Sequence, residues 1–569
     1  MNSYTNQYYS NFRFNGSNTG LGLADFLTGH ASNFLAGGSA GQNKRQEYLA
    51  VYANDTWKLR PRLTLNYGLR WQPYFPMVHL DGSAIHFDEN ALKNGIKSTR
   101  FDNSPPGVFF NGDPGFPGAA GTYTKWNNFA PRLGLAWDVT GDGRTSLRAS
   151  GGMFYDFPNT HYMVSLTSSA PWNPRYTLTG DVNFENPWSN TPGGDPFPMP
   201  QGRNVARNVQ WPNFAVVTAM NYDLPNMEVG QWNLSLQRQI SNQWLVSANY
   251  LGTKTSHMWT LQQLNPSVFL GLAPCNLGGV QYATCSTTSN NDARRRLNMT
   301  YPGVGKLYGD VPRIAPEGNA NYNALLVTVQ RNARNVTLNA NYTWSHCISD
   351  HPQPTQTAFG TNANIGWSNN DRHADHGNCA QSALDRRHIF NLSAVAATPG
   401  FANPVTRAVA SNWRISPIVK IFSGEAMTIV TSLDRSLTGD FPLQFPNLGT
   451  GGTILISERV NQVLGNPYGD RTPGKFFNSA AFAQPAFETW GNSGMGNVKG
   501  PGLWQFDLSL SKTFQVREMQ KVEFRAEAFN VFNNFSMMNP IFDLNSNFFG
   551  KVIAARDPRI MQFALKYLF

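Results

Sequence analysis

The chain has 569 residues, of which 14% are charged and 13% are aromatic, and its formal net charge is +10. Charged residues fall well below the usual share of about 25%, whereas Gly (51) and Pro (36) are abundant. This composition is typical of strands joined by turns. No apolar stretch approaches about 18 residues, which excludes a transmembrane helix, and Lys and Arg do not cluster on one element, which argues against nucleic-acid binding.

The first residues, Met1 to Gln7, contain neither the basic start nor the apolar core of a signal peptide. An exported bacterial protein needs such a peptide. We therefore expect either that the chain is not exported or that its natural start, with a signal peptide, lies upstream.

Alternation of apolar and polar residues with a period of two recurs along the chain and predicts strands. It is clearest at 62–72, where the residues from Leu63 to Trp71 alternate with Arg, Thr, Asn and Gly. The other predicted strands cover 46–58, 128–139, 143–155, 230–240, 242–252, 320–331, 335–344, 386–397, 411–423, 504–511, 521–528 and 560–569, with a further one at 7–14. About fourteen strands of about 10 residues each, tilted by about 45°, match the thickness of a lipid-facing band.

Short and long connections alternate between these strands. The short ones lie near 59–61, 140–143, 241, 332–334 and 516–518, with a longer turn around 398–410, and the long ones cover 73–127, 156–227, 253–318, 346–385, 424–502 and 532–558. A soluble sandwich has no reason to collect every long loop at one end, but a membrane barrel does. We therefore predict an all-β fold, a transmembrane antiparallel up-and-down β-barrel with short periplasmic turns and long extracellular loops.

Tryptophan recurs near the ends of the predicted strands. The set comprises Trp57, Trp71, Trp137, Trp232, Trp244, Trp344, Trp413 and Trp504. Aromatic rings in these positions are typical of the girdles at the two membrane interfaces, although core aromatics of a soluble β-protein are the alternative.

The four cysteines all fall in predicted long loops. Cys275 and Cys285 share one loop, and Cys347 and Cys379 share another. Of the three pairings that four cysteines allow, the two local bonds are favoured, because each closes within one loop on an oxidising side of the membrane.

Other candidate sites are weak. Five histidines lie between 346 and 388 (His346, His351, His373, His376 and His388), but their spacing matches no known ligand set, so we predict no metal and no cofactor. The tight basic run Arg294–Arg296 is interpreted as a solvated loop. Gly496–Gly502 precedes a strand rather than a helix, so it is a turn and not a phosphate cradle. No catalytic motif is present, and we do not expect an enzyme.

The last strand alternates cleanly and ends on an aromatic residue. Phe563, Leu565, Tyr567 and Phe569 share one face, and an outer-membrane barrel uses such a strand to close its sheet. We predict that these four residues form the C-terminal signal read by the barrel-assembly machinery.

Several stretches go beyond composition. They are Tyr52–Trp57 with Pro61–Trp71, Tyr342–Cys347, Asp385–Asn391, Lys499–Gly502 with Asp507–Lys512, Arg525–Asn533 and Asp557–Phe563. On these motifs the chain resembles the TonB-dependent receptor family, in particular its Oar-like members, over nearly its whole length.

The resemblance implies a barrel of about 22 strands with an N-terminal plug, a TonB box and energy-coupled uptake of a ligand. The sequence itself shows about fourteen strands and no recognisable plug, TonB box or signal peptide. We therefore expect residues 1–569 to be the C-terminal part of the barrel domain of a longer receptor, with TonB engaged only through the missing N-terminal region.

The predicted location is the bacterial outer membrane, with lipid, lipopolysaccharide and an unknown extracellular ligand as partners. A plug-free passive pore or a surface adhesin is the alternative, and an outer-membrane enzyme with a loop-built site is a third reading. The sequence leaves the ligand open.

Overall fold

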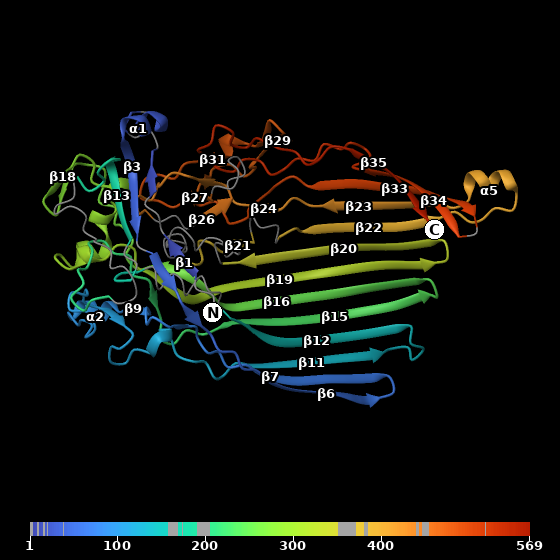
Figure 1. Ribbon diagram of the computed structural model, residues 1–569, viewed down its shortest axis with the longest axis horizontal. Helices are drawn as coiled ribbons and strands as arrows, with labels where there is room; N and C mark the ends of the chain where they lie inside the picture. Colours follow the sequence, from blue (N-terminus) through green and yellow to red (C-terminus); the bar gives the residue numbers. More distant parts are fainter. Residues whose placement is uncertain are drawn as a thin grey trace.

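The computed structural model describes residues 4–7, 11–14, 18–19, 21–37, 39–157, 169–172, 175–189, 205–350, 371–379, 385–439, 443–446, 454–517 and 519–569. Thirteen long strands form one continuous antiparallel path, in which every strand pairs with its neighbours along the chain (Figure 1). The strands are β6 (Val51–Arg60), β7 (Leu63–Trp71), β11 (Phe129–Asp138), β12 (Thr145–Asp156), β15 (Met227–Ser241), β16 (Trp244–Gln263), β19 (Pro312–Ala333), β20 (Val336–Ser349), β22 (His388–Ala397), β23 (Trp413–Phe422), β33 (Leu503–Arg517), β34 (Gln520–Phe529) and β35 (Ile560–Leu568).

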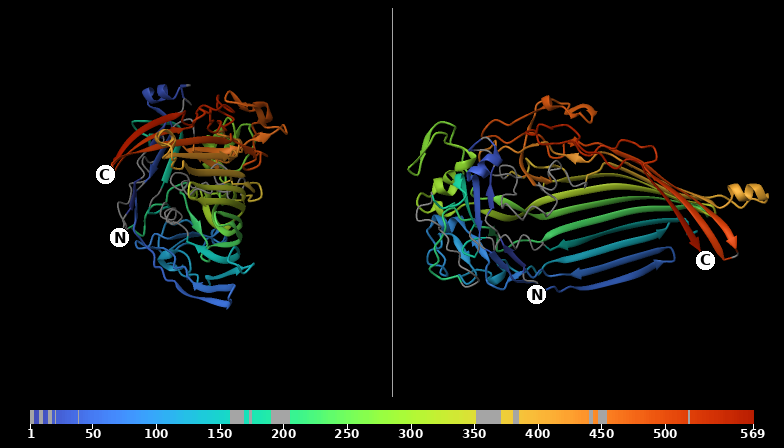
Figure 2. Two further views of the ribbon diagram at one scale, coloured as in Figure 1. Left: turned by 90° about the vertical axis from the view of Figure 1, so that its right-hand side faces the viewer. Right: turned by 45° about the horizontal axis from the view of Figure 1, so that its top comes forward.

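These strands correspond to the thirteen predicted between residues 46 and 569, and they confirm the all-β, up-and-down arrangement. The short strands β14 (Ala219–Met220) and β21 (Gly377–Asn378) add to the same sheet at β19 and β20. The sheet curves into an arc, as the end-on view in Figure 2 shows.

The fourteenth predicted strand, at 7–14, is not part of the main sheet; its residues 8–10 lie outside the described residues. Residues 4–7 form β1 (Tyr4–Gln7), which pairs with β4 (Ser39–Gln42), and β2 (Asn11–Arg13) pairs with β3 (His30–Gly37), which in turn pairs with β13 (Arg175–Asn183). The alternating residues do form strands, but these strands belong to small sheets among the loops. Within the described residues no pairing joins β6 to β35, so the sheet has two edges.

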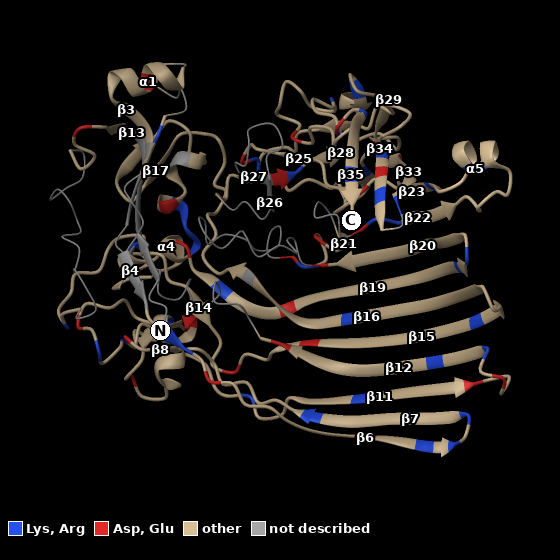
Figure 3. Cartoon of the chain, turned by 45° about the vertical axis from the view of Figure 1, so that its right-hand side comes forward, with Lys and Arg blue, Asp and Glu red and all other residues tan. Residues whose placement is uncertain are grey.

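The register gives the sheet two different faces. Starting from Phe563, Leu565 and Tyr567 on β35 and following the pairs across the sheet, one face carries mainly Leu, Val, Ile, Ala and aromatic residues. We call it the apolar face, and the opposite one, rich in Asn, Ser, Thr, Gln and Arg, the polar face. Charged residues are sparse along the strands (Figure 3).

All eight tryptophans singled out in the sequence lie on the apolar face. Trp57, Trp137, Trp244 and Trp413 stand close to the turns, whereas Trp71 and Trp504 stand at the opposite strand ends. This distribution matches two interfacial girdles better than a soluble core.

The connections separate by length. Short ones (61–62, 139–144, 242–243, 334–335 and 518–519) lie at one end of the sheet, together with the longer 398–412, which contains α5 (Pro404–Ala410). The long ones (72–128, 157–226, 264–311, 350–387, 423–502 and 530–559) lie at the other end (Figure 1). No helix in the described ranges is both long and apolar enough to cross a bilayer.

The long loops carry their own small elements. These are α1 (Gly22–Thr28), β5 (Lys44–Arg45), β8 (Val78–His79), β9 (Ile85–Phe87), α2 (Glu89–Lys93), β10 (Val108–Phe110), η1 (Gly118–Ala120), β17 (Cys275–Leu277), β18 (Val280–Tyr282), η2 (Thr288–Asn290), η3 (Asp292–Arg294), α4 (Arg296–Thr300), η4 (Gly305–Leu307), β24 (Ala426–Met427), β25 (Val430–Thr431), β26 (Leu443–Pro446), β27 (Ile454–Arg459), β28 (Asn461–Gln462), β29 (Tyr468–Thr472), β30 (Lys475–Phe477), η7 (Ser479–Ala481), β31 (Phe482–Ala483) and β32 (Val498–Lys499).

Most of the buried apolar side chains lie in these loops rather than on the strands. One core joins the loops at 72–128, 157–226 and 264–311, and includes Phe110, Met220 and Tyr308. A second core joins 423–502 with 530–559, and includes Met427 and Phe477. The loop end of the molecule is therefore a folded structure in its own right.

Candidate functional site

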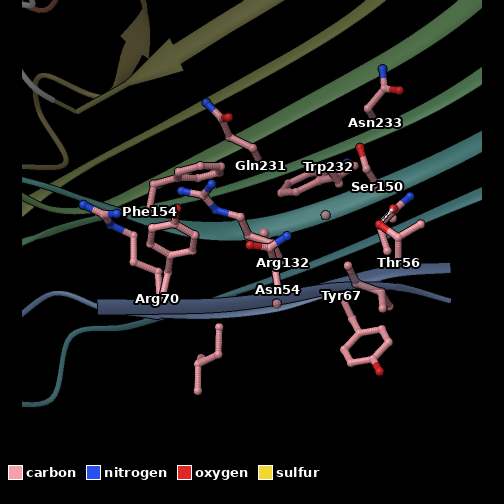
Figure 4. Close-up of a pocket in the computed structure, with 18 of the residues that line it drawn as sticks. Asn54, Thr56, Tyr67, Arg70, Arg132, Ser150, Phe154, Gln231, Trp232 and Asn233 are labelled. Carbon is pink, nitrogen blue, oxygen red and sulfur yellow. Dashed lines mark hydrogen bonds between the residues drawn. The ribbon is translucent and has the colours of Figure 1, made fainter. Parts of the chain in front are cut away.

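The polar face contains a hollow of about 800 Å³, and its walls come from six neighbouring strands, β6, β7, β11, β12, β15 and β16, with Tyr322 of β19 (Figure 4). The polar-face residues that line it are Tyr52, Asn54, Thr56, Asn66, Gly68, Arg70, Arg132, Gly134, Ser150, Gly152, Phe154, Gln231, Asn233, Leu251, Thr253 and Tyr322. Because one hollow gathers these side chains, the polar face is the concave side of the arc.

The floor of the hollow follows from the register. Arg132 pairs with Gly68 on one side and with Gly152 on the other, so the arginine is flanked by two residues without side chains. A methyl group at Gly152 would lie 3.1 Å from Arg132 Cγ, and one at Gly68 would lie 2.9 Å from the Ala53 carbonyl oxygen. Gly152 thus leaves space for the arginine side chain, whereas Gly68 allows the close approach of the β6 backbone.

The side chain of Arg132 extends toward the loops and packs against Phe154. Its guanidinium carbon is 4.7 Å from the centre of the Phe154 ring, a cation–π contact that holds the side chain along the wall. Arg70 is the diagonal neighbour of Arg132 on the same face, since their strand partners are Ala130 and Gly68, and Figure 4 shows both arginines and Phe154 along the hollow.

Arg70 is held by polar partners. Its Nε donates to Gln72 Oε1 at 2.6 Å and its Nη2 donates to the Tyr48 hydroxyl at 2.6 Å. On the far side of the hollow, Thr56 Oγ1 donates to Asn66 Oδ1 at 2.7 Å. The site is therefore preorganised rather than collapsed.

Neither arginine is neutralised by an acidic partner. Among the described residues no carboxylate stands within ion-pair distance of Arg70 or Arg132, whereas Asn54, Gln231 and Asn233 offer amide groups nearby. Two guanidinium groups beside an aromatic ring are suited to a carboxylate or phosphate group, which each can bind through two parallel hydrogen bonds.

Sequence reasoning missed this site, because Arg70 and Arg132 looked like ordinary polar residues of strands. One signal was available: Gly68, Gly134 and Gly152 occupy polar-face positions on three adjacent strands, two of them next to Arg132. Glycine inside a strand often marks a close approach by another group.

In the loop region, the basic run Arg294–Arg296 connects several loops, and its interpretation as a solvated loop was wrong. Arg294 is fully buried and donates to the carbonyl oxygens of Val268 (2.5 Å), Thr287 (2.8 Å) and Leu437 (2.8 Å). Its remaining bonds go to the side chains of Asn290 and Asn291.

The other two arginines of the run reach further loop segments. Arg295 forms an ion pair with Asp310 at 2.5 Å, and Arg296 binds both carboxylate oxygens of Glu89 at 2.6 and 2.8 Å. Three consecutive side chains therefore fix three different pieces of the loop region.

The second loop core contains a buried acid. Glu458 is fully buried and accepts hydrogen bonds from the backbone N–H of Arg435 (3.0 Å) and from Ser436 Oγ (2.7 Å). Burial, together with the nearby Asp434, raises the pKa of Glu458 to about 8. Burial therefore favours the protonated form of this carboxyl group.

The cysteines pair locally. Cys275 is bonded to Cys285, with Cα atoms 5.2 Å apart, and Cys347 is bonded to Cys379, with Cα atoms 5.4 Å apart. Each bond closes within a single long connection or joins it to the end of its strand.

The histidines of 346–388 are dispersed. His346 Nε2 lies 2.8 Å from Asn378 Oδ1, and His388 Nδ1 lies 2.7 Å from the Tyr342 hydroxyl. His373 and His376 belong to one turn, and His351 lies outside the described residues. No group of three or more potential metal ligands occurs in the described part of the chain.

Two of the sequence motifs meet in the structure. Lys499 Nζ lies 2.9 Å from Asp385 Oδ2, and the other oxygen of this buried carboxylate accepts the backbone N–H of Cys347. Gly502 leads directly into β33, as expected of a turn.

The four predicted C-terminal signal residues share the apolar face at the edge of the sheet. Phe563, Leu565, Tyr567 and Phe569 are 63, 75, 51 and 93% exposed. Their role in assembly stays a prediction.

A wall with an apolar convex face, a polar concave face and all long loops at one end is the architecture of an outer-membrane β-barrel protein. The comparison with protein families agrees: the model described as "Outer membrane beta barrel domain" matches residues 1–562. The chain belongs to this family, whose place is the outer membrane.

Among curated proteins no sequence matches the chain. Solved structures that resemble the chain include the outer membrane transporter YddB from Escherichia coli (9% identity, TM-score 0.38, covering 94% of this chain and 50% of that one). Others are the ferric enterobactin receptor PfeA from Pseudomonas aeruginosa (11%, 0.39, 95% and 51%) and the pyoverdine receptor FpvA from the same organism (9%, 0.38, 93% and 43%). The chain spans about half the length of these proteins or less.

Proposed function

We propose that this chain forms part of the barrel wall of a TonB-dependent receptor that binds an extracellular ligand bearing anionic groups and takes it up. The observation that carries the proposal is the hollow on the polar face, which Arg70 and Arg132 both line and where neither has an ion-pair partner among the described residues. Family membership and the receptor-like sequence motifs support the same function.

The position of the hollow suggests that a ligand would reach it after first binding to the long loops. It lies on the concave face of the sheet, and Arg70 and Phe154 stand at the strand ends that lead into the long loops. A ligand that first contacts the folded loops meets these two arginines next as it moves along the wall. Beyond the two arginines, amide side chains continue the row of polar groups along the concave face.

Two partners belong to this proposal. The exposed apolar residues of β35 suit recognition by the barrel-assembly machinery, and energy coupling through TonB requires an N-terminal region. Lipid and lipopolysaccharide surround the apolar face.

The test measures anion binding to the refolded chain in detergent, with citrate and inorganic phosphate as probes. We expect Arg132→Gln and Arg70→Gln each to weaken binding about tenfold, because a charge-assisted hydrogen bond contributes about 1.5–3 kcal/mol. Arg148→Gln is the matched control, since Arg148 lies on the same face of β12 outside the hollow.

Equal losses in all three variants would mean that net charge, rather than the hollow, attracts the anion. No binding of either probe to the parent chain would remove the anion site from the proposal.

A surface adhesin is the second candidate, favoured by the two folded loop cores. An adhesin would hold its ligand on the loops, so substitutions at Arg70 and Arg132 would leave capture of that ligand by whole cells unchanged.

A further inference from the structure

One connection at the turn end of the sheet differs from the others. Residues 398–412, between β22 and β23, contain the helix α5, whereas the other connections at this end are short. Asn403 caps the helix by accepting the N–H of Val405 at 2.9 Å, and Pro404 starts its first turn. Figure 1 shows α5 leaving the sheet on the side of the turns, away from the loops.

The helix is fixed to the sheet at its C-terminal end. Lys512 Nζ donates to the carbonyl oxygens of Ala408 (2.6 Å) and Val409 (2.7 Å), and Trp413 Nε1 donates to the same Val409 oxygen at 2.7 Å. Lys512 also lies 4.9 Å from the centre of the Trp413 ring and is buried. A cation at a helix C-terminus is favourable, so these contacts hold α5 in one orientation.

The side of the sheet that holds the helix is the apolar face. Trp413 and Lys512 form one pair of the β23–β33 ladder, two residues from the apolar-face pair Ile415–Leu510. Beyond Lys512 the same face of β33 continues with Phe514, which is 47% exposed. The lipid-facing band therefore runs past the point where α5 is anchored.

The helix presents apolar side chains to its surroundings. Val405 and Val409 are one helical turn apart and are 71 and 66% exposed, and Phe401 before the helix is 40% exposed. A turn in contact with water alone gains nothing from such residues, whereas an interfacial helix buries them among lipid headgroups and the first acyl carbons.

From this placement we propose that α5 lies in the headgroup region of the periplasmic leaflet, with Val405 and Val409 turned into phospholipid. The occupant is phospholipid because the anchoring residues belong to the face that already contacts lipid. Lys512 and Trp413 form a clamp, meaning that their hydrogen bonds to the C-terminal end of α5 fix how deeply the helix lies in the membrane. The exposed side chain of Arg407 lies among the lipid phosphates.

The test places a nitroxide spin label at Val409→Cys in the full chain, reconstituted in vesicles of phosphatidylethanolamine and phosphatidylglycerol. The natural cysteines are paired in the structure, so the introduced thiol is available for labelling. Phe563→Cys on the lipid face and Asp142→Cys in the β11–β12 turn are the two reference positions.

We expect the ratio of oxygen to nickel-complex accessibility at Val409 to exceed that at Asp142 at least threefold and to approach that at Phe563. A ratio equal to that at Asp142 would place the helix in water and overturn the proposal. A label closed to both reagents would mean that protein covers the helix, which would overturn it equally.

The clamp is tested separately with Lys512→Gln. We expect the label at Val409 to become more mobile while the label at Phe563 keeps its spectrum, because the substitution releases the helix without unfolding the sheet. Unchanged mobility at Val409 would show that Lys512 does not set the position of α5.

Discussion

Arg294 shows how much a single side chain can do at the loop end of this molecule. It is fully buried, and its donors satisfy three carbonyl oxygens from three separate segments, at Val268, Thr287 and Leu437. In the sequence it is one of three consecutive arginines, and a run of like charges usually signals a solvated surface. The pattern was misleading because partners far apart along the chain decide whether such a run is buried.

We predict that Arg294→Met destabilises the loop region by about 3 kcal/mol, because the carbonyl oxygens that it leaves behind lose their donors without gaining water. Hydrogen exchange of amides near 268, 287 and 437 should accelerate about a hundredfold. Arg334→Met, in an exposed turn, is the control. Equal exchange in both variants would contradict the structural role of Arg294.

Glu458 makes the loop end sensitive to pH. Its folded pKa of about 8 lies above its ordinary value of 4.5, so between these values the folded state keeps a proton that the unfolded state has lost. The stability of the second loop core should therefore be highest below about pH 5 and fall as pH rises, by at most about 1.4 kcal/mol per unit.

Thermal unfolding recorded at pH 5, 6.5 and 8 checks this expectation. In Glu458→Gln the decline should flatten, because the amide cannot ionise. A decline of the same slope in the variant would assign the pH dependence to another group.

At the scale of elements, the strands of the main sheet were predictable and the loop structure was not. Alternation places every other residue on one face, so strands such as β7 and β34 could be located from their own residues. Their ends were less accurate: β16 and β19 extend well beyond the predicted 242–252 and 320–331. The extended parts of β16 and β19 pair with each other beyond the lipid-facing part of the sheet. Neither face contacts lipid there, so apolar and polar residues no longer alternate.

The candidate site could be predicted only in part, because it depends on register. Each strand shows its glycine or arginine separately, but only the pairing of Arg132 with Gly68 and Gly152 forms the floor of the hollow. The same reason explains why the contact between Asp385 and Lys499 was not foreseen, although both belong to motifs visible in the sequence. Strand 7–14 was misplaced because alternation does not reveal which partner a strand will choose.

At the scale of the whole molecule, the two edges β6 and β35 govern behaviour. Both carry exposed apolar residues, and among the described residues neither has a partner on its outer side. Unpaired edges of this length invite pairing with other chains.

We therefore expect the 569-residue chain, expressed alone and refolded in detergent, to show no faster-migrating band in unheated samples on a denaturing gel. Closed barrels resist the detergent and give such a band, whereas an open sheet does not. A heat-sensitive shift would mean that β6 and β35 pair and that the chain closes into a smaller barrel.

Of the three hydrophobic cores at the loop end, the two larger ones are joined by one side chain. Loops from the first half of the chain fold around one core and loops from the second half around the other, and Arg294 reaches across from the first to the Leu437 carbonyl of the second. Because this buried guanidinium is shared between the two, Arg294→Met should lower the cooperativity with which the two cores unfold.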